Sequence, residues 1–407
     1  MARDRYAVLE IGDFRWALLA RLFDSFGNQM MGVAAAWQIY QLTKSPLHLG
    51  FIGLAEGLPF MAAALWAGSL ADRSEKRAMI TAAKAGILVQ ALGLAYLSGL
   101  ESPPLLPFYA CLAWGGFSRS LLWASASTYV QGVVPKELFP KAAAWSTGVL
   151  HAATIAGPAL SGVVFDRWGA RAAFSTVCVL FAAAALCALR LRPMPARPQA
   201  AAPGWDGFLS GLRFVRGEPV VLAAMSLDMF GVMFGGVKGV LAMFAVLLGV
   251  GASGLGLLQA APALGALLTS LLMVHRDPFR ESGKTFISCV ALFGLSMIAF
   301  ALSRNFWLSA ALLAFGGAVD CVGMILRSSI YQAVTPEGLR GRVNAVNGIF
   351  IRSSNEIGVF ESGLAARFMG LAPSVVFGGC MTLVSVGVAL ALAPALWRFR
   401  LAPDPDQ

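Results

Sequence analysis

Long apolar stretches alternate with short polar segments along the whole chain. Each stretch is close to the roughly 20 residues that a helix needs to cross a bilayer. Twelve stretches qualify: Phe14–Tyr40, His48–Leu70, Ala78–Leu100, Leu105–Val130, Phe139–Phe165, Ala172–Leu189, Val220–Leu247, Gly254–Val274, Thr285–Leu302, Phe306–Tyr331, Val343–Phe368 and Ser374–Trp397. The pattern predicts an all-α polytopic membrane protein with twelve transmembrane helices.

Composition and charge agree with this class. Hydrophobic residues make up 58% of the 407 residues and charged residues 13%, whereas a soluble domain has about 25% charged residues. Lys and Arg concentrate in alternate loops, on the side that also holds both termini, so the positive-inside rule predicts cytoplasmic termini in the plasma (inner) membrane. The net charge of +10 follows from this bias and from anionic lipid, and we expect no nucleic-acid partner.

The two halves of the sequence repeat each other at an offset of about 200 residues. Three features recur in the same order. An aspartate followed by glycines occurs at Asp24 and again at Asp228, and a glycine pair occurs at Gly115-Gly116 and again at Gly316-Gly317. The set Gly157, Ser161 and Gly162 recurs as Gly358, Ser362 and Gly363. Parallel repeats of six helices are an architecture of transporters. We therefore expect six-helix bundles at 1–190 and 220–407. The segment 191–219 is expected to be a cytoplasmic linker, with a short interfacial helix over Gly207–Arg216 or with no helix at all.

Ionisable residues lie inside several of the apolar stretches. A charge at membrane depth costs several kcal/mol unless it meets a partner or a water-filled cavity. The proton-coupling candidates are the acids Asp24, Asp320, Glu361, Glu56, Asp228 and Glu356, and the substrate-cavity candidates are Arg119, Arg327 and Arg21. Lys84 lies about two turns from one end of its stretch and is expected to reach the membrane surface with its long side chain.

Some of these charges have partners of opposite sign on the same predicted helix. Arg21 and Asp24 are three residues apart, Arg352 and Glu356 are four apart, and Asp320 and Arg327 are two turns apart. Such spacings place both side chains on one face. These charges are therefore either a polar pathway or structural ion pairs that hold the bundle together.

The loop after the second stretch contains a recognisable signature. Gly68 is followed four residues later by Asp72-Arg73 and then by Arg77. This resembles the signature of the major facilitator superfamily between its second and third helices, except that Glu75 replaces a glycine. The resemblance implies a gating motif in which Asp72 caps the eleventh helix at its positive dipole end.

A second motif lies in the fifth stretch. Gly157-Pro158 and Gly162 resemble a degenerate antiporter motif of exporters in the same superfamily, although small residues also serve ordinary helix packing. Over nearly the whole chain, segments such as 54–59, 211–214 and 335–342 resemble the enterobactin-exporter-like branch. The resemblance implies the major facilitator fold, with helices 1, 4, 7 and 10 lining a central cavity and helices 3, 6, 9 and 12 facing lipid. Lys84, in helix 3, would then face lipid.

Other chemistries are not indicated. The six cysteines fall inside apolar stretches without CxxC spacing or histidine neighbours, so we expect neither a metal site nor a cofactor. Ser282-Gly283-Lys284-Thr285 ends like a phosphate-binding loop, but Pro278 stands where the first glycine is required. With no nucleophile motif, we do not expect an enzyme.

We interpret the sequence as a secondary active transporter. The function expected is proton-coupled export of an amphipathic small molecule, siderophore- or drug-like, by alternating access, with the chain acting as a monomer. A carboxylate in a desolvated cavity is readily neutralised by a proton, which would provide the coupling. The alternatives are an importer or lipid flippase of the same fold, or a non-transporting membrane sensor.

Overall fold

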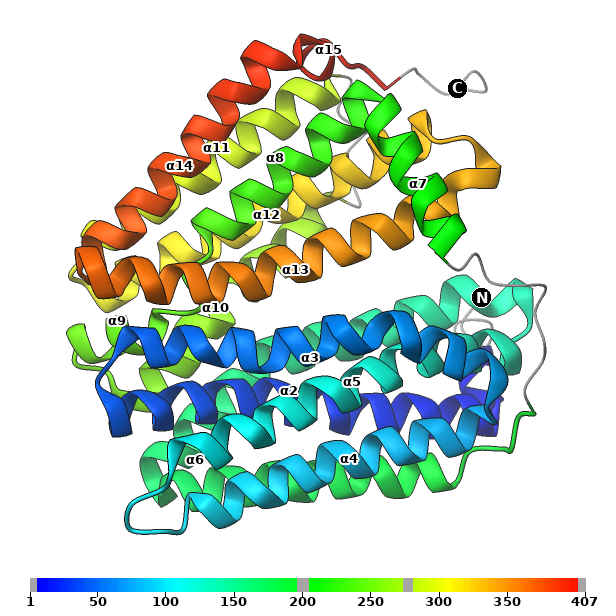
Figure 1. The fold of residues 1–407 in the computed structure, drawn as a ribbon, viewed down its shortest axis with the longest axis vertical. Coiled ribbons are helices and arrows are strands. Elements are labelled where there is room, and N and C mark those ends of the chain that lie inside the picture. Colours follow the sequence, from blue (N-terminus) through cyan, green and yellow to red (C-terminus); the bar gives the residue numbers. More distant parts are fainter. Residues whose placement is uncertain (1–5, 196–204, 274–280, 402–407) are drawn as a thin grey trace. The chain divides into compact units, whose positions relative to one another are not determined.

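The computed structural model describes residues 6–195, 205–273 and 281–401, and in these ranges it contains helices and no strand (Figure 1). The helices, in chain order, are η1 (Ala7–Glu10), α2 (Gly12–Thr43), α3 (Pro46–Arg73), α4 (Lys76–Leu97), α5 (Leu105–Val133), η2 (Lys136–Leu138), α6 (Phe139–Leu189), α7 (Trp205–Gly217), α8 (Pro219–Gly235), α9 (Leu241–Leu247), α10 (Gly251–Met273), α11 (Ser282–Leu302), α12 (Phe306–Val334), α13 (Glu337–Met369), α14 (Leu371–Leu392) and α15 (Pro394–Trp397).

The chain forms two compact units. The first comprises Met1–Lys44, Leu54–Ala201 and Val250–Ala260, and the second comprises Ser45–Gly53, Ala202–Gly249 and Ala261–Gln407. In the first unit α2 packs along α6, and α4 packs along both α5 and α6. In the second unit α11 packs along α12 and α14, and α8 packs along α13 and α14.

Within the described residues, each of the twelve predicted membrane segments is mainly helical, and the seventh and twelfth each contain two helices. Seven described helices are long and apolar enough to cross a membrane by composition alone, or eight if the bent pair α7–α8 counts as one span. Two of the helices that fall outside this set, α2 and α13, carry several charged residues each.

The fifth, sixth and seventh predicted segments depart from straight, separate spans. The fifth and sixth form one element, α6, which turns at Gly169, where φ is +79°; an L side chain rarely adopts this conformation. The seventh was predicted as one continuous helix, which is wrong, because α8 ends at Gly235 and α9 begins at Leu241. Ser362 of α13 donates a hydrogen bond to the Gly236 carbonyl at 2.7 Å and thereby satisfies a backbone group at this break.

The internal repeat is present in the packing of small residues. Ser161 of α6 donates to the Met30 carbonyl of α2 at 2.8 Å, as its repeat counterpart Ser362 does to α8. A Cβ added at Gly116 would collide with the Glu56 carbonyl of α3, and one added at Gly317 with the Pro262 carbonyl of α10. Equivalent positions in the two halves therefore hold equivalent helices at close range.

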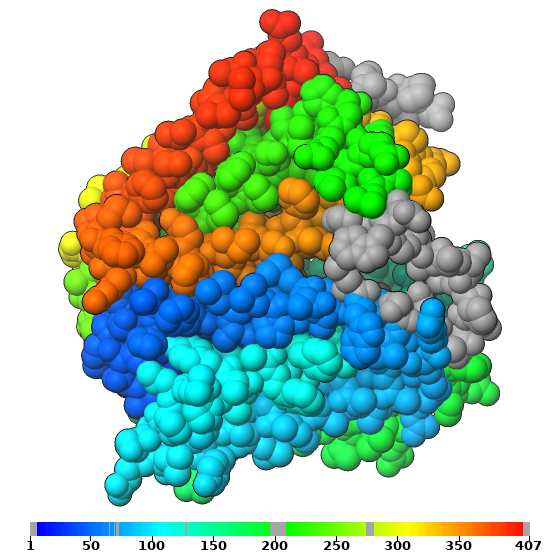
Figure 2. Space-filling model, in the orientation of Figure 1, coloured from blue at the N-terminus to red at the C-terminus, as the bar shows by residue number. Residues whose placement is uncertain are grey.

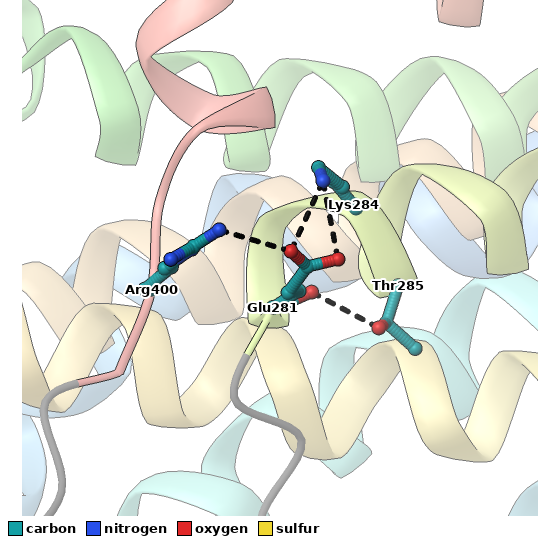
Figure 3. A network of polar contacts seen from close by, with 4 residues as sticks. All are labelled: Glu281, Lys284, Thr285 and Arg400. Atoms are coloured by element: carbon teal, nitrogen blue, oxygen red, sulfur yellow. Dashed lines mark hydrogen bonds and ion pairs between the residues drawn. The ribbon is translucent and has the colours of Figure 1, made fainter.

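The segment that was predicted to link the two bundles contains a short helix. α7 spans Trp205–Gly217 and is bent by 104° from α8. Val215 of α7 is buried in an apolar cluster with Val221 of α8 and Leu396 of α15. At the same end of the unit, Glu281 accepts hydrogen bonds from Lys284 and Arg400, each at 3.1 Å (Figure 3).

Candidate functional site

The first unit holds an ion pair between α2 and α4. Lys84 Nζ lies 3.4 Å from Asp24 Oδ1 and also donates to the Ala20 carbonyl at 3.4 Å. Lys84 is only 4% exposed. The expectation that Lys84 faces lipid is therefore wrong, because α4 turns this side chain toward α2. No ion pair joins Arg21 to Asp24 in the described part of the chain, and Arg21 is exposed.

A second cation, Arg119 of α5, is held by three helices. Its Nε donates to Asn28 Oδ1 of α2 at 2.8 Å, and its Nη2 donates to Gln90 Oε1 of α4 at 3.2 Å. Its Nη1 lies 3.9 Å from Glu56 Oε1 of α3. Nη1 and the Gln90 Nε2 amide are buried and have no hydrogen-bond acceptor among the described residues. The cluster thus holds two buried hydrogen-bond donors that are free to bind an acceptor.

The second unit pairs Asp228 of α8 with Arg327 of α12. Arg327 is 6% exposed, so its charge is neutralised inside the unit. Asp228 and Asp320 also line a cavity of about 20 Å³ between α8, α11 and α12, together with Cys289, a volume sufficient for about one water molecule. Asp320 itself has no ion-pair partner in the described ranges, so the predicted relation between Asp320 and Arg327 is replaced by the Asp228–Arg327 pair.

The remaining predicted acids lie on α13. Glu361 is half-buried and is without an ion-pair partner among the residues described. Glu356 is half-buried and interacts with other groups, as does Arg352. The predicted charges are therefore divided between the two units: Asp24, Glu56 and Arg119 belong to the first, and Asp228, Asp320, Arg327, Glu356 and Glu361 belong to the second.

The signature after the second span begins inside α3. Gly68 has no heavy atom within 4 Å of where a Cβ would be, so within the described part it makes no close helix contact. Arg73 is exposed and Arg77, in α4, is half-buried; the side chain of Asp72 lies outside the described residues.

Glu75, the departure from the signature, has a defined role. Its carboxylate accepts a hydrogen bond from the Ala78 amide at 3.2 Å and caps the N-terminus of α4. Its other oxygen accepts from the Met194 amide at 3.3 Å. A glycine could do neither, so here the signature loop is stabilised by a side chain.

The antiporter-like motif is a packing surface in the first unit. A Cβ added at Gly157 would lie 2.8 Å from Gln29 Cβ of α2, and one added at Gly162 would collide with the Ala252 carbonyl of α10. A Cβ added at Gly256 of α10 would likewise collide with the Pro158 carbonyl. Just beyond the motif, Asp166 accepts hydrogen bonds from the Ala252 and Ser253 amides at 3.0 and 2.7 Å and caps α10.

Sequence reasoning missed three members of these clusters. Asn28, Lys84 and Gln90 bind the predicted charges, yet none was proposed as a site residue. The available signal was their position: each is a polar side chain inside an apolar span, where it needs a partner.

Comparison with known proteins identifies the family of this chain. The family model MFS_3, described as transmembrane secretion effector, matches residues 4–400. The chain belongs to this family of major facilitator transporters. The predicted all-α major facilitator fold and the branch resemblance are confirmed. The protein is accordingly a multi-pass inner-membrane secondary transporter.

Individual relatives and structures agree with this assignment. The enterobactin exporter EntS of Citrobacter koseri is 27% identical over 398 residues, covering 97% of this chain and 95% of that protein. EntS of Salmonella typhi is 26% identical over 395 residues, covering 96% and 94%. In fold, the chain is similar to a mutant form of the nucleoside transporter NupG, with a TM-score of 0.73 at 14% identity over 94% of this chain and 99% of that one. A bacterial homologue of the human lysosomal transporter Spinster gives a TM-score of 0.68 at 14% identity over 98% and 99%.

Proposed function

We propose that this transporter exports an amphipathic, siderophore- or drug-like small molecule in exchange for protons. The observation that carries the proposal is the Arg119 cluster, in which a cation and the Gln90 amide present buried donors without acceptors among the described residues. A buried donor left unpaired is costly, so a substrate with neighbouring acceptor oxygens would be bound favourably. The full-length similarity to enterobactin exporters supports a substrate of this chemistry.

The second unit is the proposed site of proton coupling. Asp24, Glu56 and Asp228 each lie beside a cation that supplies a counter-charge. Asp320 and Glu361 face none in the described residues and lie on membrane helices, where a neutral acid is less costly than a charged one. Proton binding at Asp320 would also change the charge of the cavity it shares with Asp228, next to the Asp228–Arg327 pair.

Two further properties complete the proposal. The Lys/Arg bias supports cytoplasmic termini, and the chain is proposed to work as a monomer. Asp72 is proposed to act in gating at the cytoplasmic ends of the helices, as the superfamily signature implies.

Transport in proteoliposomes tests the proposal. The purified full chain is reconstituted, and uptake of enterobactin and of a cationic dye is followed with and without a pH gradient. We expect gradient-driven enterobactin flux that falls at least tenfold in Arg119→Met and Gln90→Leu. We expect Asp320→Asn to lose gradient-driven flux while keeping downhill exchange.

Two results would contradict these assignments. Flux of enterobactin that is indifferent to Arg119→Met would exclude the Arg119 cluster as the substrate site. Full gradient-driven flux in both Asp320→Asn and Glu361→Gln would exclude the second-unit acids as proton carriers. Dye flux without enterobactin flux would support the drug-like branch of the proposal and reject the siderophore branch.

A further inference from the structure

An apolar groove runs between α8 and α14 in the second unit, outside the polar clusters described above. Its volume is about 530 Å³, within the range of small-molecule sites. Of its lining residues only Ser226 and Ser385 are polar; the others include Leu222, Phe230, Val384 and Val388. Figure 2 shows α8 and α14 side by side on one face of the molecule. Such a groove offers no partner for a charged or strongly polar ligand.

The groove is long enough for an acyl chain. On α8 it extends from Pro219 to Phe234, about 22 Å at the helical rise of about 1.5 Å per residue. One leaflet of a bilayer has a hydrocarbon depth of about 15 Å, half of the full core. A single lipid chain therefore fits along α8 without leaving the groove.

One end of the groove lies next to segments that carry basic residues. Pro219 and Ala393 line this end, where α7 turns away from α8 by 104° and packs with α15 in one apolar cluster. Three exposed arginines belong to these segments and have no carboxylate bound to them in the described structure: Arg213, Arg216 and Arg398.

Among the residues whose side chains are described, the acids at this end do not cancel the positive charge. Glu281 is already bound by Lys284 and Arg400 (Figure 3). Glu218 is half-buried at the N-cap position of α8, where the helix dipole favours a negative charge. The described residues of these segments thus carry a positive surplus at the end of an apolar channel.

We propose that this groove binds one anionic phospholipid, with an acyl chain between α8 and α14 and the phosphate at Arg216 and Arg398. An apolar channel that ends in cations matches an anionic amphiphile, because basic residues near a membrane surface attract anionic headgroups. The bent helix α7 places its arginines across the end of the span rather than along it, where a headgroup lies.

Native mass spectrometry of the purified full chain tests this site. The probes are dioleoylphosphatidylglycerol and dioleoylphosphatidylcholine, which share their acyl chains and differ in net charge. We expect one phosphatidylglycerol to be retained in preference to phosphatidylcholine. Arg216→Gln and Arg398→Gln should each weaken retention about fivefold. Arg304→Gln is the matched control, an exposed arginine in the loop between α11 and α12, and should leave retention unchanged.

The groove itself is tested by filling it. Ala223→Phe should reduce retention of phosphatidylglycerol, whereas Leu292→Phe, at an exposed apolar position of α11, should not. If Ala223→Phe does not fold, Ser226→Leu replaces it as a smaller filling. Equal retention of both lipids, or retention that survives groove filling and both arginine variants, would show a non-selective lipid shell and overturn the proposal.

Discussion

Lys84 of α4 lies 3.4 Å from Asp24 of α2, and the pair is largely shielded from solvent. The ammonium group lies inside a span that is otherwise apolar, so it stabilises the carboxylate at membrane depth. Removing one member of a buried pair leaves the other as an uncompensated charge, which is far more costly than removing both.

Lys84→Met should therefore destabilise the protein by about 2–3 kcal/mol, slightly below the range for fully buried pairs, because Asp24 retains 23% side-chain exposure. The double variant Asp24→Asn/Lys84→Met should recover most of this loss. A double-mutant cycle of unfolding in detergent measures the coupling. Equal stability of Lys84→Met and the wild type would show that the pair is not energetically coupled.

Asp228→Asn is expected to have a larger effect. Arg327 is almost completely buried, and without Asp228 its guanidinium would have no counter-charge, at a cost of about 3–5 kcal/mol. The variant Asp228→Asn/Arg327→Met serves as the control and should unfold at nearly the wild-type denaturant concentration. If the single variant is as stable as the double, the ion pair does not stabilise the second unit.

Asp166→Ala should loosen the start of α10. The carboxylate accepts two backbone hydrogen bonds, and loss of an N-cap costs about 1–2 kcal/mol. Amide exchange at Ala252 and Ser253 should accelerate roughly 5- to 30-fold. Asp166→Asn keeps one acceptor oxygen and should be intermediate, and Glu101→Ala, in an exposed loop, should change nothing. Unchanged exchange in Asp166→Ala would mean that the cap is not formed in solution.

The contact of Glu281 with Lys284 and Arg400 should depend on pH. The hydrogen bond and charge of Lys284, followed by the charge of Arg400, lower the pKa of Glu281 below its ordinary value. Because the folded pKa is lowered, the stabilisation is complete above the ordinary carboxyl pKa and is lost as pH falls through the lowered value. An NMR titration of the Glu281 carboxyl should show this midpoint, and Lys284→Met should return it toward the ordinary value. A midpoint unaffected by Lys284→Met would assign the shift to another group.

The sequence predicted the helices well because apolar length alone determines which segments can cross a membrane. The break after α8 was missed although Gly235, Gly236 and Gly239 signal it, since hydrophobicity continues through the glycines. The pairing of charges was less predictable. Spacing along one helix suggested Arg21 for Asp24 and Arg327 for Asp320. Asp24 instead pairs with Lys84 and Arg327 with Asp228, each on another helix, and Asp320 has no ion-pair partner among the described residues. Which faces of two helices meet depends on how far each helix is rotated about its own axis. That rotation is set by side-chain packing across the bundle, and it cannot be read from the spacing of residues in one sequence.

The hydroxyl of Ser362 lies 2.7 Å from the Gly236 carbonyl and 2.8 Å from the Gly358 carbonyl of its own helix. A serine hydroxyl has one proton to donate, so it can serve only one of these two oxygens at any moment. When it serves Gly236, it joins the interrupted seventh span to the eleventh; when it serves Gly358, the end of α8 loses that donor. A single hydroxyl proton thus forms this hydrogen bond between the two spans. Rotation about one side-chain bond of Ser362 breaks the hydrogen bond without unwinding either helix.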